Sequence, residues 1–134
     1  MLRLSGVPLH SRDRQGLKNI VFAGGVCAFN PEPLADYIDF FSLGEGEEST
    51  VEIVSLYQKA QAKNWDKDRF LLEVSKIDGV YVPSFYRHEY NPDGTLERIV
   101  PLNGAPATVT KRIVEDLDHT YFPTKPIVAS TEIV

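Results

Sequence analysis

The sequence contains one cysteine, no long apolar run and no basic stretch. A lone thiol, Cys27, can form no internal disulfide and cannot supply the several thiolates of a structural zinc site or an iron–sulfur cluster. We therefore expect no metal ligands and no bound cofactor in this chain. No apolar run reaches the roughly 18 residues that span a bilayer, and residues 1–9 lack the long apolar stretch of a signal peptide. These absences predict a cytoplasmic protein without a membrane partner.

The charge balance argues against nucleic acid as a partner. The 134 residues include 14 Lys and Arg against 19 Asp and Glu, a formal net charge of −5, and the basic residues do not gather in any run. Binding a phosphate backbone needs such a concentration of positive charge. A hydrophobic share of 43% is that of an ordinary globular domain.

Two short apolar runs predict parallel strands. Residues 20–25 are Ile-Val-Phe-Ala-Gly-Gly, and residues 38–44 are Ile-Asp-Phe-Phe-Ser-Leu-Gly, so both runs end in glycine. A continuous apolar run closed by a glycine turn is typical of a strand buried on both faces of a parallel sheet. The sequence therefore predicts an α/β fold.

Two helices are expected after these strands. In residues 48–63, apolar positions recur at helical spacing. Three glutamates stand where this helix would begin: Glu45, Glu47 and Glu48. Acidic side chains there complement the positive end of the helix dipole, an interpretation that we favour over a general acid/base or metal-binding role. Asp66 is placed to cap a second helix over about 67–76, with Trp65 and Phe70 at the positions of a hydrophobic staple.

From Gly79 onward the sequence becomes aromatic and β-branched. Residues 80–86 and 96–102 predict the arms of a hairpin, whose aromatic residues would cover its own sheet or dock against a missing domain. Pro83 has no N–H to donate, which favours an edge position for the first arm. Residues 108–115 are expected to form a further strand, and the closing residues resemble an extended linker.

The predicted parallel sheet is too small for its apolar strands. Isolated two-stranded units are marginal in water, so further strands are expected from the rest of a longer polypeptide. An uncovered apolar edge recruits another chain. We therefore predict a homodimer or larger assembly of this chain.

The remaining reactive side chains lack a pattern that supports chemistry. His10, His88 and His119 show no spacing typical of metal ligands, and we expect them on the surface. Cys27 has no His or basic neighbour in the sequence, which favours a small loop residue over a nucleophile. We therefore expect no catalytic residue in this chain.

The candidate site consists of the two glycine turns, at Gly24, Gly25 and 44–47. In open α/β sheets, the turns after parallel strands lie at the carboxyl edge, where ligands bind, and glycine lets backbone amides approach a ligand. Tight turning alone explains such glycines equally well. Neither turn matches a Walker A motif or a dinucleotide fingerprint.

Several stretches resemble one protein family. The Gly-Gly turn, the Pro-Glu segment and the strand that runs into Gly-Glu-Gly-Glu are similar to the second half of the cobalamin-binding-type domain that precedes the catalytic barrel in many radical S-adenosylmethionine proteins. The similarity continues in Asn-Pro-Glu-Pro-Leu-Ala-Asp at 30–36, in Gly-Val-Tyr-Val-Pro-Ser-Phe-Tyr at 79–86 and in the closing Pro-Ile-Val-Ala-Ser-Thr-Glu-Ile-Val. It covers nearly the whole chain.

The resemblance implies a partial Rossmann-like sheet divided over two segments. Residues 1–78 would form the C-terminal half of a cobalamin-binding-like domain, and residues 79–134 a hairpin and linker toward a missing barrel. Gly24 and Gly25 would line the groove for the nucleotide tail of a cofactor. The opposite wall would consist of Gly44, Glu45, Gly46 and Glu47.

By the same resemblance, the parent protein would hold a [4Fe-4S] cluster on a CxxxCxxC motif and use S-adenosylmethionine, with cobalamin as a further candidate cofactor. Neither that motif nor the DxHxxG motif of many cobalamin domains is in the sequence. The chain would then be a non-catalytic accessory portion of a radical S-adenosylmethionine enzyme of unknown substrate, and the remaining domains of that polypeptide would be its partners. The alternative is a stand-alone, non-enzymatic interaction or small-ligand module.

Overall fold

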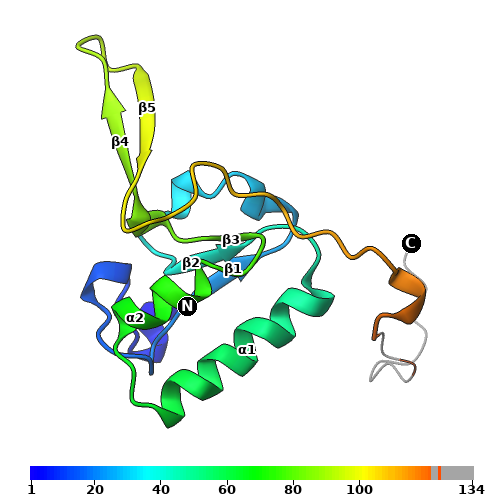
Figure 1. Ribbon diagram of the computed structural model, residues 1–134. Coiled ribbons are helices and arrows are strands. Elements are labelled where there is room, and N and C mark those ends of the chain that lie inside the picture. Colours follow the sequence, from blue (N-terminus) through cyan, green and yellow to red (C-terminus); the bar gives the residue numbers. More distant parts are fainter. Residues whose placement is uncertain (122–123, 125–134) are drawn as a thin grey trace, which may run out of the picture.

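The computed structural model describes residues 1–121 and residue 124 (Figure 1). The described chain contains helices and strands in the order β1 (Phe22–Gly24), β2 (Phe40–Ser42), α1 (Gly46–Ala62), α2 (Lys67–Val74), β3 (Val80–Tyr81), β4 (Tyr86–Tyr90) and β5 (Leu96–Pro101). This mixture confirms the predicted α/β class. Within this part of the chain, no helix combines the length and the apolarity that crossing a membrane requires.

The central sheet has the strand order β1–β2–β3. β1 and β2 run parallel with Phe22 opposite Phe40, which confirms the predicted parallel pair. β3 joins the other side of β2 in the antiparallel direction, with Tyr81 opposite Phe41. All of β2 is buried, but Phe22 of β1 is 47% exposed. The prediction that both strands are buried on both faces is therefore wrong for 20–25, because the core that the helices form over the sheet contains Phe40 of β2 but does not reach Phe22 of the edge strand β1.

Both helices cover one face of this sheet (Figure 1). Successive residues of a strand point to opposite faces, so Phe40 packs under the helices whereas Phe41 packs with Tyr81 and Ala28 on the other face. The larger core joins β2, both helices and the segment around β3. Its buried members are Phe40, Ile53, Ala60, Phe70, Leu71, Val74, Val80, Val82 and Phe85.

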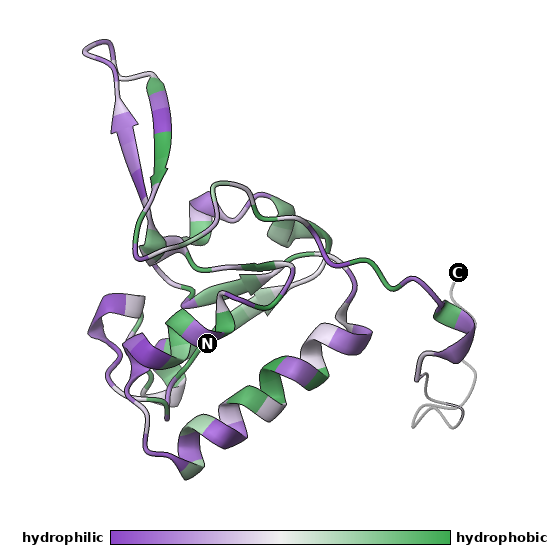
Figure 2. Cartoon of the chain, viewed as in Figure 1, coloured by the Kyte–Doolittle hydropathy of each residue, from purple (hydrophilic) through white to green (hydrophobic). Residues whose placement is uncertain are grey.

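The two helices follow the sequence pattern closely. Asp66 caps α2 by accepting a hydrogen bond of 2.8 Å from the backbone N–H of Arg69, and Trp65 packs against the core that contains Phe70. α1 buries the face that carries Ile53 and Ala60, whereas Val51 and Val54, which belong to the apolar positions with helical spacing in 48–63, stay exposed. Figure 2 shows hydrophobic and hydrophilic residues alternating along α1.

The hairpin is shorter than the prediction. β4 and β5 pair antiparallel over 86–90 and 96–101, and they extend away from the body of the chain (Figure 1). Residues 80–81, expected in the first arm, instead form β3 of the central sheet. Pro83 is buried at the start of the 3-10 turn that links β3 to β4, so the prediction of an edge strand at Pro83 is wrong. A missing N–H suits the first position of such a turn equally well.

The aromatic residues divide between the body and the hairpin. Tyr81 and Phe85 are buried in the body, and Tyr86 packs at the base of the hairpin, with its ring 4.8 Å from that of Tyr81. Tyr90, near the hairpin turn, is exposed. Only this last aromatic residue is available for docking as the sequence analysis expected.

The segment after the hairpin crosses the sheet without forming a strand. Within 108–115 one isolated parallel bridge joins Arg112 to Gly44, so the predicted strand is wrong in this region. We call residues 110–114 the strap. The proline-rich end expected to form a linker lies outside the described residues, apart from residue 124.

Candidate functional site

The Gly24–Gly25 turn is open to solvent at the end of β1. A Cβ on Gly25, which has a φ of +97°, would meet nothing within 4 Å, and the residue is exposed. Gly24 lies opposite Ser42 of β2, and a Cβ there would lie 3.3 Å from the Ser42 carbonyl oxygen. The turn is therefore exposed at the carboxyl edge of the parallel pair, although the carbonyl of Gly25 accepts a hydrogen bond of 3.0 Å from the N–H of Ala28.

The Gly44 turn lies at the same edge but is covered by the strap. Gly44 has a φ of +100°, and a Cβ there would lie 2.7 Å from the backbone nitrogen of Arg112 and closer still to its carbonyl oxygen. The N–H of Arg112 donates to Leu43 O at 2.8 Å, and the N–H of Glu45 donates to Arg112 O at 3.1 Å. Gly44 is thus required because another stretch of backbone occupies the space beside it.

The glutamates at the start of α1 hold the strap. The Glu45 carboxylate accepts a hydrogen bond from the backbone N–H of Val114. The guanidinium of Arg112 lies 2.7 Å from Glu48 Oε2 and 2.9 Å from Glu52 Oε1, and the hydrogen bond to Glu48 raises the pKa of Arg112 above its ordinary value. Gly46 and Glu47, the other two predicted site residues, are exposed in the first turn of the helix.

A polar cluster that the sequence analysis missed lies at the base of the hairpin. The Tyr81 hydroxyl donates to Glu32 Oε1, and His88 Nε2 lies 3.1 Å from Glu32 Oε2. Burial and the Glu32 carboxylate raise the pKa of Tyr81 well above its ordinary range. A cavity of about 440 Å³ lies beside the cluster, lined by Glu32, His88, His10 and Ser84 among others.

This cluster joins two stretches that carry the family resemblance, because Glu32 belongs to 30–36 and Tyr81 to 79–86. The prediction that His10 and His88 are surface residues is wrong. Both are partly buried, and His10 stacks on Tyr37 with ring centroids 5.1 Å apart. The signal that could have found this site was the coincidence of a glutamate and a tyrosine within the two most family-like stretches.

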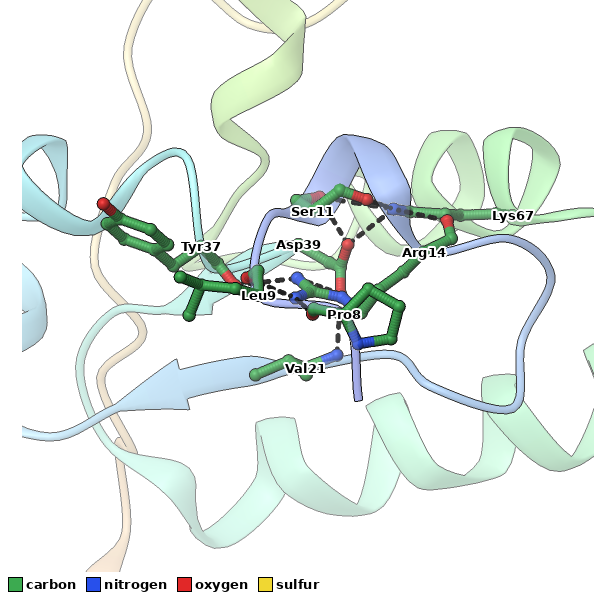
Figure 3. A network of polar contacts seen from close by, with 8 residues as sticks. All are labelled: Pro8, Leu9, Ser11, Arg14, Val21, Tyr37, Asp39 and Lys67. Carbon is green, nitrogen blue, oxygen red and sulfur yellow. Dashed lines mark hydrogen bonds and ion pairs between the residues drawn. The ribbon is translucent and has the colours of Figure 1, made fainter. Parts of the chain in front are cut away.

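A second missed cluster lies buried between the N-terminal segment, β2 and α2 (Figure 3). Asp39 precedes β2 and is fully buried, and it pairs with Arg14 at 2.9 Å and with Lys67 at 2.7 Å. It also accepts hydrogen bonds from the Ser11 hydroxyl at 2.5 Å and from the Val21 N–H at 2.7 Å. A charge within the apolar run 38–44 was the signal, because a buried carboxylate requires partners.

The geometry of this second cluster identifies it as structural. The Arg14 guanidinium also donates hydrogen bonds to the carbonyl oxygens of Pro8, Leu9 and Tyr37, at 3.0, 3.0 and 2.7 Å. Every charge is paired, and Arg14 and Asp39 are completely shielded from solvent, so the cluster fastens the N-terminal segment to the sheet. It offers no free group to a substrate.

Within the described residues, no group of three or more His, Cys, Asp or Glu side chains is arranged to hold a metal ion. Cys27 is exposed in the 3-10 turn Val26–Phe29 that follows the first glycine turn. One exposed thiol does not fit a [4Fe-4S] cluster, which is bound by several cysteine thiolates.

Comparison with known families supports the resemblance. Residues 1–83 match the family described as radical SAM proteins, N-terminal, where SAM stands for S-adenosylmethionine. The match covers more than half of the chain and includes the central sheet, both helices and both glycine turns. The chain therefore belongs to this family of N-terminal regions of radical SAM proteins. The searches of curated proteins and of solved structures returned no match.

Proposed function

We propose that this chain is a non-catalytic accessory portion of a cytoplasmic radical SAM enzyme, and that the carboxyl edge of its sheet faces a cofactor of that enzyme. The observation that carries the proposal is the family match over 1–83 together with the position of both glycine turns at one sheet edge. In this proposal the parallel pair β1–β2 is part of a larger Rossmann-like sheet. Residues 1–78 supply that sheet and residues 79–134 lead toward the catalytic domain.

The parent enzyme would supply the redox chemistry. In radical SAM proteins, as the family resemblance implies, a [4Fe-4S] cluster and S-adenosylmethionine belong to the catalytic barrel. This chain has one cysteine, which is too few to hold such a cluster. The contribution that we propose for this chain is to bind a cofactor of that enzyme and to orient it.

Cobalamin fits one part of the edge better than the other. Gly24 and Gly25 are both exposed, and at Gly25 nothing lies within 4 Å of the place that a Cβ would take, which suits the approach of a nucleotide tail. Gly44 and Glu45 already bond to the strap. The Gly24–Gly25 turn is therefore the first contact that we propose for a cofactor.

Titration with hydroxocobalamin, followed by visible absorbance, tests the cofactor proposal. The unaltered chain should show a saturable spectral change, and Gly25→Val should abolish it. Gly94→Val is the matched control, because Gly94 also has a positive φ of +85° and open space around it but lies in the hairpin turn. Equal responses of the two variants, or no saturable response at all, would count against a cofactor at this edge.

The accessory role is tested by S-adenosylmethionine cleavage. With dithionite as reductant, the chain alone should form no 5′-deoxyadenosine, whereas the whole radical SAM protein with its cluster should form it. Product from the purified chain would contradict the proposal. Elemental analysis of the same sample should show no stoichiometric iron, cobalt or zinc.

We also propose that the isolated chain self-associates. β1 is a sheet edge with Phe22 exposed, and Phe22 stacks on Phe40 at 5.1 Å beside an apolar cavity of about 210 Å³. The hairpin exposes a second apolar surface at Tyr90, Leu96 and Ile99. Open edges and apolar patches of this kind are natural pairing surfaces.

A further inference from the structure

The strap occupies a groove that is shaped for peptide backbone. On one side, the N–H of Leu43 donates to Gly79 O at 2.7 Å, and on the other the carbonyl of Leu43 accepts from the N–H of Arg112 at 2.8 Å. Arg112 therefore bonds to the turn between β2 and α1 as an added strand would bond to a sheet. Recognition of this kind gives affinity through main-chain hydrogen bonds and specificity through side chains.

Two glycines create the floor of this groove. A Cβ on Gly44 would overlap the backbone of Arg112, and a Cβ on Gly79 would lie 3.0 Å from the Arg112 nitrogen and 2.5 Å from Leu43 O. Both glycines also have positive φ, at +100° and +86°. The groove is thus a gap left by two missing side chains, and it admits one extended backbone.

Charge selects the first residue of the bound segment. The Arg112 guanidinium is shared among Glu48, Glu52 and, at 3.9 Å, Asp78. Two nitrogens of the guanidinium, Nε and Nη2, bond to the same oxygen of Glu48, at 3.2 and 2.7 Å. Arginine supplies several N–H donors in one plane for these carboxylates, whereas lysine supplies a single point charge, so the site favours arginine over lysine.

Burial selects the third residue of the segment. Val114 is 5% exposed, and its N–H donates to the Glu45 carboxylate. Between the two anchors, Ile113 is exposed. The pattern that the groove recognises is an arginine, a residue of any kind and a small apolar residue in an extended conformation.

From this match of backbone, charge and burial, we infer that the groove formed by Gly44, Gly79 and the start of α1 is a recognition site for an extended Arg-Xaa-Val segment. Residues 112–114 fill the site as an intramolecular ligand. A second peptide of the same pattern binds when the chain's own strap is displaced. The inference does not depend on a cofactor at the Gly24–Gly25 turn.

A peptide-binding experiment on the whole chain tests the inference. The variant Arg112→Ala weakens the internal strap, and a fluorescently labelled peptide with the sequence of residues 110–115, Thr-Lys-Arg-Ile-Val-Glu, is the probe. Fluorescence anisotropy should show binding to this variant at least about tenfold tighter than to the unaltered chain, whose tethered strap competes at an effective concentration on the order of millimolar. The same peptide with alanine in place of its arginine should bind at least about tenfold more weakly, as expected for loss of charge-assisted hydrogen bonds.

Groove variants separate specific binding from a general charge effect. Adding Glu48→Gln to the Arg112→Ala chain should weaken peptide binding, though no more than loss of the peptide's arginine does, because Glu52 still contacts the guanidinium. Glu47→Gln removes the same charge from the same helical turn and should leave binding within about twofold. Circular dichroism and thermal unfolding establish that each variant is folded. If the folded Arg112→Ala chain fails to bind the peptide, or binds the peptide with and without arginine equally, the inference is wrong. Failure of cobalamin binding leaves this result unaffected, so the two proposals are tested separately.

Discussion

Asp39 and Arg14 form an ion pair of 2.9 Å in which both side chains are completely shielded from solvent. The pair lies 25 residues apart in sequence and connects the N-terminal segment to the residue before β2. Lys67 adds a contact of 2.7 Å from α2. One carboxylate thus fixes three segments of the chain relative to one another.

Removing this carboxylate should cost a large part of the stability. Asp39→Ala leaves two cations and a backbone N–H without their partner, and such breaks of buried pairs cost about 3–5 kcal/mol. Urea unfolding followed by circular dichroism measures the change. Arg12→Ala is the control, because Arg12 forms only an exposed contact of 4.0 Å with Asp13 and should change the unfolding free energy by less than about 0.5 kcal/mol. Similar losses in both variants would show that the buried network is not the source of the stability.

Alanine at the two glycine turns should have unequal effects. At Gly25 the cost is that of the backbone conformation alone, about 1–3 kcal/mol, because its φ of +97° and ψ of −179° lie in a region that is essentially restricted to glycine, and a Cβ there meets nothing within 4 Å. At Gly44 the same strain is joined by overlap with the backbone of Arg112, so Gly44→Ala should lose more stability and release the strap. Amide hydrogen exchange at Arg112 and Val114 provides the second measurement. Equal exchange rates in the two variants would contradict the close approach.

The hydroxyl of Tyr81 should make stability depend on alkaline pH. Burial, and then the Glu32 carboxylate, raise its pKa far above the ordinary 10.0. Below about pH 10 both folded and unfolded chains hold the proton, so the stabilisation is fully present. As pH rises above that value, the unfolded chain loses the proton first and stability falls.

Tyr81→Phe should therefore reduce the slope with which the unfolding free energy falls above about pH 10. The reduction should be at most about 1.4 kcal/mol per pH unit. Unfolding free energies at a series of pH values measure the slope. Tyr90→Phe, which removes an exposed phenol, should leave the slope unchanged. If the unfolding free energy of the Tyr81→Phe chain falls with pH as steeply as that of the unaltered protein, this prediction is wrong.

Charge substitutions should locate the self-association surface. Phe22→Glu should restore a monomer if β1 pairs with another copy, and Ile99→Glu should do so if the hairpin is the interface. Light scattering at tens of micromolar measures the mass. Val26→Glu, at another exposed apolar position, is the control. A monomeric mass of the unaltered chain would refute self-association.

The local signals in the sequence were sufficient for most of the individual elements. Asp66 has a capping side chain directly before an amphipathic run, and the two glycine-terminated apolar runs do form a parallel pair. Each of these features is determined by residues within a few positions of one another. Such short-range patterns have the same meaning in most folds.

The errors occurred where distant residues decide the outcome. Residues 80–81 have the composition of a hairpin arm, but β2 offers them a partner, and Pro83 then ends the pairing. Nothing near Gly44 in the sequence indicates that Arg112 will lie beside it. The Glu32–Tyr81–His88 cluster likewise depends on three segments that only the folded chain brings together.

The late position of the strap has a consequence for folding during synthesis. A ribosome releases the chain from its N-terminus, and domains fold as their residues emerge. The last buried residue of the larger core is Phe85, so all of these buried residues precede the strap in the sequence. The groove at Gly44 and Gly79 can therefore take shape before Arg112 has emerged from the ribosome. During that interval the groove is vacant, and the nascent chain exposes a site that only its own later residues are placed to fill.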